Sequence, residues 1–239
     1  MSVVDWYESN YKTHKLKSQR MYPNEEFIRF LSKYFLCLNL NERKTKKILE
    51  LGSGLGSNLI PIINEGLQAY GIDISKQSIN LTRQRFNELN MSGLLKGGAD
   101  LLDCNCLEFD IKYSFKFDGI IDIFSMYCLT TKDFEDLLQK IYNKLNHGGY
   151  FYSFFPSKNS VAFINHQPSK LIDNSTLNGI YRESSPYFGN FYNFRFMYPL
   201  EYKLLLEKYN FKVLEINTII RNHNLKETFE HISITAIKE

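Results

Sequence analysis

The fold of this chain is set by the stretch Ile48-Leu49-Glu50-Leu51-Gly52-Ser53-Gly54-Leu55-Gly56, in which a short apolar strand runs into glycines. The glycines let the backbone turn sharply and let a ligand approach the main chain closely. A helix is expected from Ser57 to about Glu65, and its first turn would offer unpaired N–H groups. The stretch therefore predicts a strand, a loop and a helix that bind a nucleotide-like ligand.

The spacing of the glycines separates the possible ligand classes. A dinucleotide fingerprint reads G-x-G-x-x-G and would need a glycine at position 57, where the chain has Ser57. The GK[ST] ending of a phosphate-binding loop is also missing. Glu50 stands just before the glycines, and a carboxylate there is unfavourable beside a pyrophosphate. The pattern favours a ligand that carries an ammonium group.

Beyond this stretch, apolar strands and helices alternate. Strands are expected at 67–72, within 99–109, and at 117–124 and 150–155, with helices at 24–35, 76–89 and 131–145. A helix at 200–209 then leads to strands 211–219 and 229–238, which a polar connection at 221–226 joins. Two strands without a helix between them suggest an antiparallel pair. This order predicts an α/β fold with a doubly wound, mostly parallel seven-stranded sheet and an antiparallel last strand.

Four further motifs follow the glycine stretch in order: Gly71-Ile72-Asp73-Ile74-Ser75, Cys104-Asn105-Cys106-Leu107-Glu108-Phe109, Phe117-Asp118-Gly119-Ile120-Ile121-Asp122 and Leu145-Asn146-His147-Gly148-Gly149. Together with Glu50-x-Gly52-x-Gly54-x-Gly56, they resemble the class I S-adenosylmethionine (SAM)-dependent methyltransferases of the stand-alone bacterial small-molecule type. Asn105 departs from that family, which usually has Asp there. The resemblance is strong over about residues 46–156 and extends to 200–238 by element order only. It implies a Rossmann-like methyltransferase fold with SAM as cofactor.

The resemblance also implies roles for the matched residues. Asp73 is at the position of the acid that binds both ribose hydroxyls, Ile74 would pack on the adenine, and Asn105 would lie near the adenine amino group. Asp122 ends the fourth strand, where it would contact the methionine portion or the acceptor, or else cap the following turn. The residues expected to bind SAM are Glu50, Gly52, Ser53, Gly54, Gly56, Asp73, Ile74, Asn105 and Asp122.

The acceptor is expected to bind to the irregular parts of a single domain spanning 1–239. Residues 1–26 would form an N-terminal lid, and residues 157–198 an acceptor-binding insertion, because long connections in a compact domain are usually functional or disordered. Many aromatic residues argue against disorder. The candidate substrate-binding residues are Tyr7, Tyr11, Tyr22, Tyr187 and Tyr192. The alternative is that the aromatic residues of the insertion only fill the core.

Catalytic candidates depend on the acceptor. An alcohol needs a general base, whereas an amine can dispense with one. His166 follows the fifth strand at the edge where such sheets bind ligands, and it is the candidate base beside Asp122. His231 and His223 reach the same edge from the last two strands, while His147 lies at the opposite edge.

Composition limits the partners. A formal net charge of only +3 without a dense basic tract argues against nucleic acid, as does Asp122-Ile123-Phe124-Ser125, which lacks the N/D-P-P-Y/F pattern of amino-methylating DNA and RNA enzymes. The four cysteines have no metal-ligand spacing and fit a cytoplasmic protein with reduced thiols. No secretion signal and no membrane-length apolar run are visible.

These observations predict SAM-dependent methylation of a small molecule, and one acceptor class that fits is a hydroxyl of a sugar or of a nucleotide-linked glycan precursor. The alternatives are an RNA methyltransferase and a catalytically inactive SAM-binding protein. The oligomeric state stays open.

Overall fold

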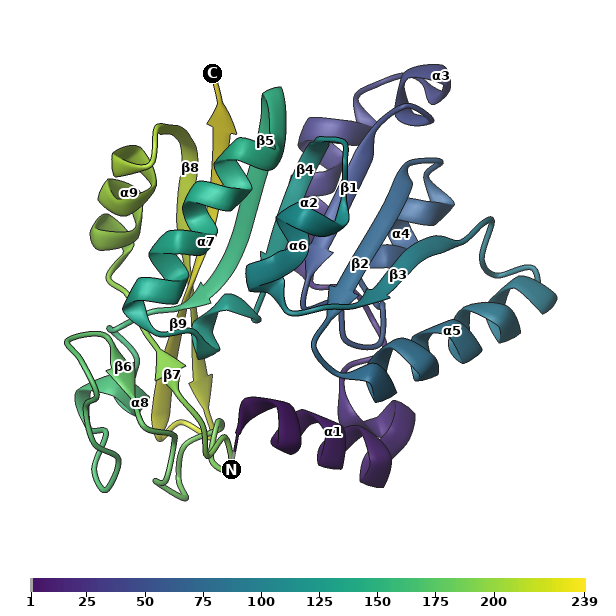
Figure 1. Ribbon diagram of the computed structural model, residues 1–239. Coiled ribbons are helices and arrows are strands. Elements are labelled where there is room, and N and C mark those ends of the chain that lie inside the picture. The colour runs from purple at the N-terminus through teal and green to yellow at the C-terminus, as the bar shows by residue number, and fades with distance from the viewer. Residues whose placement is uncertain (1) are drawn as a thin grey trace.

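The computed structural model describes residues 2–239 and contains a seven-stranded sheet with the order β3-β2-β1-β4-β5-β9-β8 (Figure 1). The strands are β1 Lys47–Leu51, β2 Gln68–Asp73, β3 Ala99–Asp103, β4 Phe117–Ile123, β5 Leu145–Pro156, β8 Phe211–His223 and β9 Glu227–Lys238. Neighbouring strands are parallel except that β9 runs antiparallel to both β5 and β8. The predicted fold class is confirmed, and the antiparallel last strand lies one place inside the edge.

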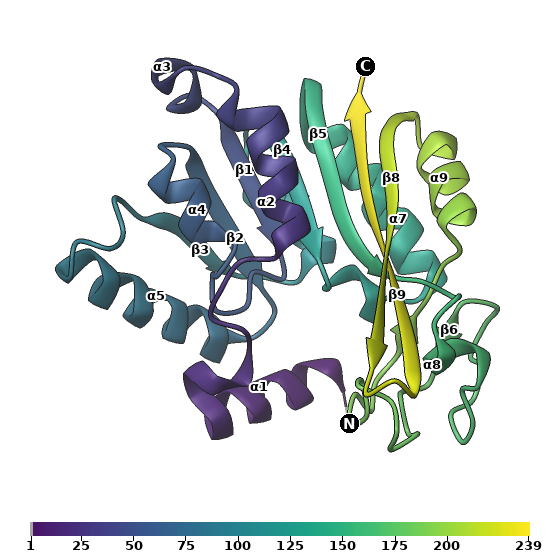
Figure 2. The ribbon, with the colours of Figure 1, turned by 180° about the vertical axis from the view of Figure 1, so that it is seen from behind.

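Helices cover both faces of this sheet. α2 Glu25–Leu31, α4 Leu59–Asn64 and α5 Lys76–Met91 pack with one hydrophobic cluster, and α6 Phe109–Lys112, α7 Thr131–Lys144 and α9 Pro199–Lys208 pack with the other (Figures 1 and 2). Short elements complete the chain: η2 Ser32–Leu36, α3 Leu40–Arg43, η3 Cys106–Glu108 and η4 Met126–Cys128. β1 and β4 are buried along almost their whole length, as central parallel strands are.

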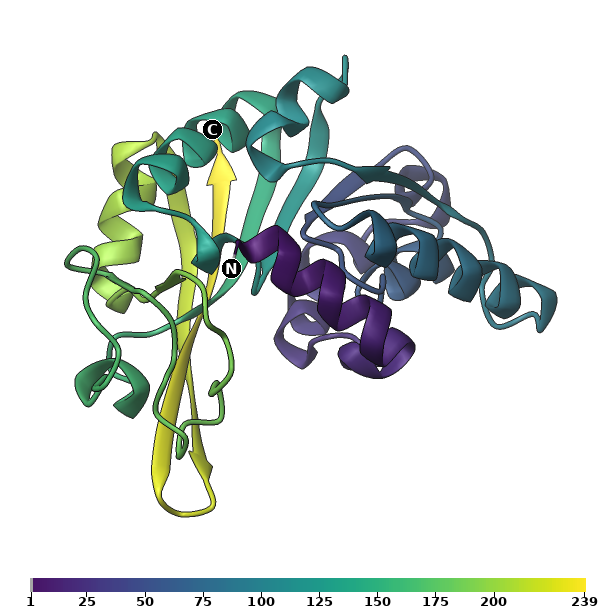
Figure 3. The same ribbon diagram turned by 60° about the horizontal axis from the view of Figure 1, so that its bottom comes forward.

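The N-terminal segment differs from expectation because it is helical. α1 Val3–His14 and the 3-10 turn η1 Lys15–Ser18 lie across the carboxyl ends of the parallel strands (Figure 3). Ser2 caps α1 by accepting the amide of Asp5, whose carboxylate accepts the Ser2 amide in return. This Ser-x-x-Asp arrangement is a capping box, which is a local sequence signal for a helix start.

The hairpin of β8 and β9 is longer than predicted. The connection expected at 221–226 is only three residues long, between His223 and Glu227, because both strands continue past the sheet edge and pair with each other. Figure 3 shows this hairpin projecting beyond the other strands. The polar residues 221–223 suggest a loop, but a two-stranded ribbon tolerates polar side chains on its solvated side, and the structure continues β8 through them.

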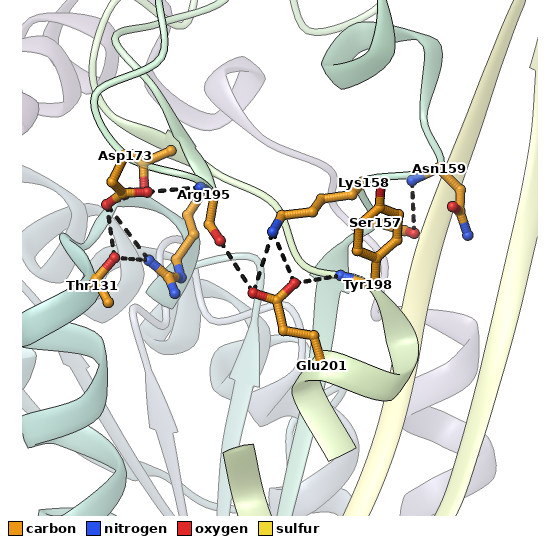
Figure 4. Close-up of polar contacts among 10 residues, drawn as sticks. Thr131, Ser157, Lys158, Asn159, Asp173, Arg195, Tyr198 and Glu201 are labelled. Atoms are coloured by element: carbon orange, nitrogen blue, oxygen red, sulfur yellow. Dashed lines mark hydrogen bonds and ion pairs between the residues drawn. The ribbon is translucent and has the colours of Figure 1, made fainter. Parts of the chain in front are cut away.

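The segment 157–198 contains only short elements: α8 Val161–Ile164, β6 Thr176–Leu177 and β7 Phe194–Arg195. Two buried cations fix it to the rest of the fold (Figure 4). The Lys158 Nζ donates to both carboxylate oxygens of Glu201 in α9, at 2.9 and 3.2 Å. Arg195 donates to the hydroxyl of Thr131 in α7 at 2.6 Å, and that hydroxyl donates to Asp173. Buried charges that are paired in this way hold an irregular segment in one position.

Within residues 2–239, no helix is long and apolar enough to cross a membrane. The four cysteines carry free thiols.

Candidate active site

The glycine loop has the geometry that its residues predict. Gly52, Gly54 and Gly56 all have positive φ angles, of 66°, 51° and 71°, which favour glycine. A Cβ atom on Gly52 would lie 2.3 Å from the Cβ of Ser125, in the loop after β4. One on Gly56 would lie 2.7 Å from the ring of Phe86 in α5. The glycines therefore shape the turn and also let its neighbours pack closely.

Glu50 at the end of β1 is buried, with 1% of its surface exposed. Its Oε1 accepts a hydrogen bond from the side-chain amide of Asn58 at 2.6 Å. Its Oε2 and the hydroxyl of Ser53 are buried without a hydrogen-bond partner among the described residues. Burial raises the pKa of Glu50 to about 8. Buried polar atoms normally have partners, so these two oxygens at the glycine loop are available to a ligand with donors such as an ammonium group.

Asp73 at the end of β2 accepts backbone N–H bonds from Gly54 and Ser75, both at 2.9 Å. Burial raises the pKa of this carboxyl, while the two amides counteract the rise. Each oxygen keeps a lone pair that can accept a hydroxyl of a ligand. The amide oxygen of Asn105 accepts from the Leu107 backbone at 3.0 Å, so its NH₂ group is the part available to a ligand.

Two cavities open at this edge of the sheet. The first, of about 290 Å³, is named the glycine-loop cleft and is lined by Val3, Tyr7, Tyr11, Gln19, Gly52, Asp73, Ile74, Cys104, Asn105, Cys106, Leu107, Phe124, Ser125, Cys128, Leu129, Thr130, Asp133 and Asn193. It collects the cofactor candidates Gly52, Asp73, Ile74 and Asn105. The thiol of Cys128 in its wall stays protonated, because burial raises its pKa to about 12.

The second cavity, of about 540 Å³, is named the arginine chamber. It is lined by Tyr7, Gln19, Arg20, Pro23, Asn24, Glu25, Glu50, Gly52, Ser53, Ser57, Asn58, Ile123, Phe124, Tyr127, Phe154, Tyr187, Arg221 and His231. Tyr7, Gln19, Gly52 and Phe124 line both cavities, so the cleft and the chamber meet at these residues.

Phe124 has a left-handed backbone with φ of 61°, which is strained for an aromatic residue. Asp122 maintains this turn: its side chain is fully buried and accepts the amides of Ser125 and Met126 at 3.0 and 2.9 Å. Its other oxygen accepts the Ser153 hydroxyl at 2.8 Å. Asp122 lines neither cavity and acts as the cap that the sequence left as an alternative. Strain at the junction of two cavities is typical of functional sites.

The N-terminal segment that contains α1 and the insertion at 157–198 contact each other over the glycine-loop cleft. The hydroxyl of Tyr7 shares hydrogen bonds with those of Tyr127 and Tyr192, at 3.0 and 3.1 Å. The indole N–H of Trp6 donates to the Gly189 carbonyl at 3.2 Å. The Gln19 side chain reaches the glycine loop, where its Oε1 accepts the Leu55 amide at 3.3 Å. These contacts position a cover over both cavities.

The five tyrosines predicted to bind the acceptor differ in whether they line a cavity. Tyr7 and Tyr187 line the arginine chamber, and Tyr11 lines the glycine-loop cleft. Tyr192 is buried and holds Tyr7 without lining a cavity. Tyr22 is 81% exposed and lies outside both cavities.

The histidines also differ in whether they line a cavity. His166 lines neither cavity, and its Nδ1 contacts the Phe163 carbonyl at 2.9 Å. His231 lines the chamber, where its Nε2 lies 2.5 Å from the Tyr187 hydroxyl and its ring stacks on Phe154. Burial, and to a smaller extent the charge of Arg221, lower the pKa of His231 to about 4. The imidazole is therefore neutral at physiological pH, with a free lone pair but a lower basicity than an exposed histidine has.

Several lining residues were not predicted from the sequence, among them Gln19, Phe124 and Arg221. Gln19 and Phe124 belong to no motif that could have singled them out. Arg221 was placed in a loop, but the register pairs Arg221 with Phe229 and Ile219 with His231, so Arg221 and His231 share one face of the hairpin. The alternation of Ile219-x-Arg221 on one strand and Phe229-x-His231 on the other is the sequence pattern that could have predicted this shared face.

The sequence was compared with models of known protein families and matches one of them. Residues 49–151 match a family model described as a methyltransferase domain. No curated protein matches the chain in sequence.

Solved structures resemble the whole chain at low identity. A SAM-dependent methyltransferase from Methanosarcina mazei aligns with a TM-score of 0.62 and 17% identity, covering 87% of this chain and 96% of that one. Magnesium protoporphyrin IX methyltransferase from Synechocystis PCC 6803, solved with SAM, aligns at 0.63 and 13%, covering 99% and 95%. The 1,6-didemethyltoxoflavin N1-methyltransferase of Burkholderia thailandensis, solved with 1,6-didemethyltoxoflavin and S-adenosylhomocysteine, aligns at 0.57 and 14%, covering 100% and 91%. At such identities the likeness establishes the fold.

Proposed function

We propose that this chain, a class I SAM-dependent methyltransferase, transfers the methyl group of SAM to a small molecule held in the arginine chamber. The family-model match over residues 49–151 agrees with the motif resemblance, and this part of the prediction is confirmed. The identity of the acceptor is the proposal.

SAM, which when bound supplies an electrophilic methyl group on its sulfonium, fits the glycine-loop cleft together with Glu50 and Ser53 of the adjoining arginine chamber. Glu50 and Ser53 would hold the ammonium group, because their buried oxygens have no partner among the described residues. Asp73 would accept the two ribose hydroxyls, and Ile74 and Asn105 would contact the adenine. The carboxylates of Glu50 and Asp73 also favour a cationic ligand on this side.

The observation that carries the proposal is the chamber itself. It joins the glycine-loop cleft at Gly52 and Phe124, and α1 and the insertion cover it. A cavity of about 540 Å³ lies within the range of small-molecule sites. A base inside a nucleic acid would have to pass this cover, and the chain offers no dense basic tract to bind phosphates. The small metabolite bound to the Burkholderia enzyme is in keeping with such an acceptor.

For a hydroxyl acceptor, His231 replaces His166 as the proposed base. The Tyr187 hydroxyl borders the chamber and shares a hydrogen bond with His231 Nε2. This pair can take up the proton of the acceptor hydroxyl while the oxygen–carbon bond forms and the carbon–sulfur bond breaks with its electrons staying on sulfur. Positioning donor and acceptor in line would supply much of the rate. A hydroxyl of a sugar or of a nucleotide-linked glycan precursor is the acceptor class in keeping with this chemistry.

The test is to incubate the purified protein with methyl-labelled SAM and a fractionated cell extract. We expect label in a low-mass fraction, and none with the Asp73→Ala variant. Label in RNA would support the RNA methyltransferase alternative, and label nowhere, together with intact SAM binding, would support the inactive SAM-binding protein.

A further inference from the structure

Two arginines set the arginine chamber apart from the rest of the molecule. The chain has eight arginines, and six of them donate side-chain hydrogen bonds to other residues. The guanidinium groups of the other two, Arg20 and Arg221, have no hydrogen-bond or ion-pair partner among residues 2–239, and both line this chamber. A guanidinium has five donors in a rigid fork that fits carboxylates and phosphates, so two free forks in one cavity indicate anionic ligands.

The charges of the chamber do not balance without a ligand. Its other titratable acids are Glu25, which pairs outward with Arg29 at 2.8 Å, and Glu50, which faces the proposed ammonium site. No lysine lines the chamber. Arg20 and Arg221 are both exposed on the open side of the chamber, although the groups packed around Arg20 desolvate its guanidinium enough to lower its pKa. Two cations therefore face one carboxylate across a partly enclosed space, where electrostatic interactions are stronger than in water.

SAM supplies only part of the compensation. It brings two cationic groups, the ammonium that suits Glu50 and the sulfonium, and only one carboxylate. Arg20 belongs to the segment that crosses the glycine loop, since its backbone carbonyl accepts the Ser57 hydroxyl at 2.8 Å. Arg20 is thus the cation nearer the methionine portion. Arg221 comes from β8, and its charge acts on His231, which also lines the chamber from the hairpin, so it is left for the second ligand.

The position of Arg221 fits an acceptor group. Arg221 and His231 are diagonal neighbours across the β8–β9 pair, with Cβ atoms about 7 Å apart. Tyr187 packs on Phe229, the residue directly opposite Arg221, and its hydroxyl meets His231. A small molecule whose hydroxyl lies at Tyr187 and His231 can therefore place an anionic group at Arg221 within a few bonds.

We propose that the acceptor is a small hydroxylated anion whose carboxylate or phosphate group pairs with Arg221. This inference rests on the proposed function, because it names the chemical class of the molecule in the same chamber. It makes Arg221 a specificity-determining residue that a neutral acceptor would not need.

The first test uses simple anions and needs no knowledge of the acceptor. Wild-type protein saturated with S-adenosylhomocysteine is titrated calorimetrically with inorganic phosphate and with malonate. We expect at least one to bind, and Arg221→Gln to weaken that binding about tenfold or more, as the loss of a charged hydrogen-bonded pair does. Lys226→Gln, which removes the same charge at the hairpin tip outside the chamber, should bind like wild type. The anion that binds distinguishes a phosphate site from a carboxylate site.

The second test follows the labelled product. We expect the methylated low-mass product to be retained on an anion exchanger at neutral pH. Arg221→Gln should raise the KM for that fraction about tenfold to a hundredfold while SAM affinity stays unchanged. A neutral labelled product, or anion binding that Arg221→Gln leaves intact, would overturn the proposal. Label nowhere would defeat the proposed function alone, and the calorimetric titration would then still decide whether Arg221 binds an anion.

Discussion

The glycine-loop cleft and the arginine chamber meet at Gly52 and Phe124, yet the chain encodes them differently. Asp73 and Asn105 in the cleft follow their strands almost directly, and each belongs to a short motif. The chamber instead joins Arg20, Tyr187, Arg221 and His231 from separate segments. A site for a shared donor can be local in sequence because parallel strands bring their carboxyl ends to one edge. A site for a particular acceptor depends on how distant segments pack.

The two regions also differ in charge. The glycine-loop cleft presents the carboxylates of Asp73 and Asp133, and the arginine chamber presents the guanidinium groups of Arg20 and Arg221, with Glu50 where the chamber meets the glycine loop. A cationic donor and an anionic acceptor would each find complementary charge on its own side. If this division is correct, substitutions in one region should leave binding in the other unchanged.

The largest effect is expected for Asp73→Ala. The change removes the acceptor of two backbone amides and of the proposed ribose hydroxyls, so SAM affinity should fall about a hundredfold or more by calorimetry. The fold, followed by circular dichroism, and the binding of anions in the chamber should persist. Unchanged SAM affinity would count heavily against the assignment of the cleft.

Substitution of His231 should affect turnover rather than donor binding. His231→Gln keeps a polar group beside Tyr187 but removes the base, so kcat should fall about a hundredfold while SAM affinity is retained. His166→Gln is the matched control, since His166 lines neither cavity, and its kcat should stay near that of wild type. A larger loss with His166→Gln than with His231→Gln would reverse the choice of base.

A smaller effect is expected from pH. The pKa of Glu50 is raised to about 8 by burial without a ligand, so most of this carboxyl is protonated at pH 7. A bound ammonium group favours the ionised form, so binding releases a proton and SAM affinity should rise severalfold per pH unit between pH 6 and 8. Calorimetry in two buffers of different ionisation enthalpy would detect that proton.

Glu50→Gln is the control for this pH dependence. It should bind SAM more weakly and with a flatter pH profile, because its amide does not titrate in this range. A Glu50→Gln variant with the wild-type profile would mean that another group, for which Asp73 is the first candidate, is responsible.

Particular residues show how far the sequence could be used. Gly52 and Asp73 were predictable because their roles follow from backbone freedom and from a position at a strand end. Asp122 also lies near the end of its strand, but whether a carboxylate there faces a ligand or caps a turn depends on the path of the next four residues. The backbone amides of Ser125 and Met126 both donate to the Asp122 carboxylate, so this residue caps the turn. The choice between His166 and His231 depends on long-range packing, since both reach the same edge of the sheet.

By itself the sequence determined the α/β sheet, the glycine turn and the acidic side of the donor site, because hydrophobic periodicity and glycine conformation act over a few neighbouring residues. Only the tertiary structure decided that the N-terminal helix covers that site and that Arg221 faces the same chamber as Arg20 and His231. These contacts join residues up to about two hundred positions apart, and no local pattern records which of them meet when the chain packs.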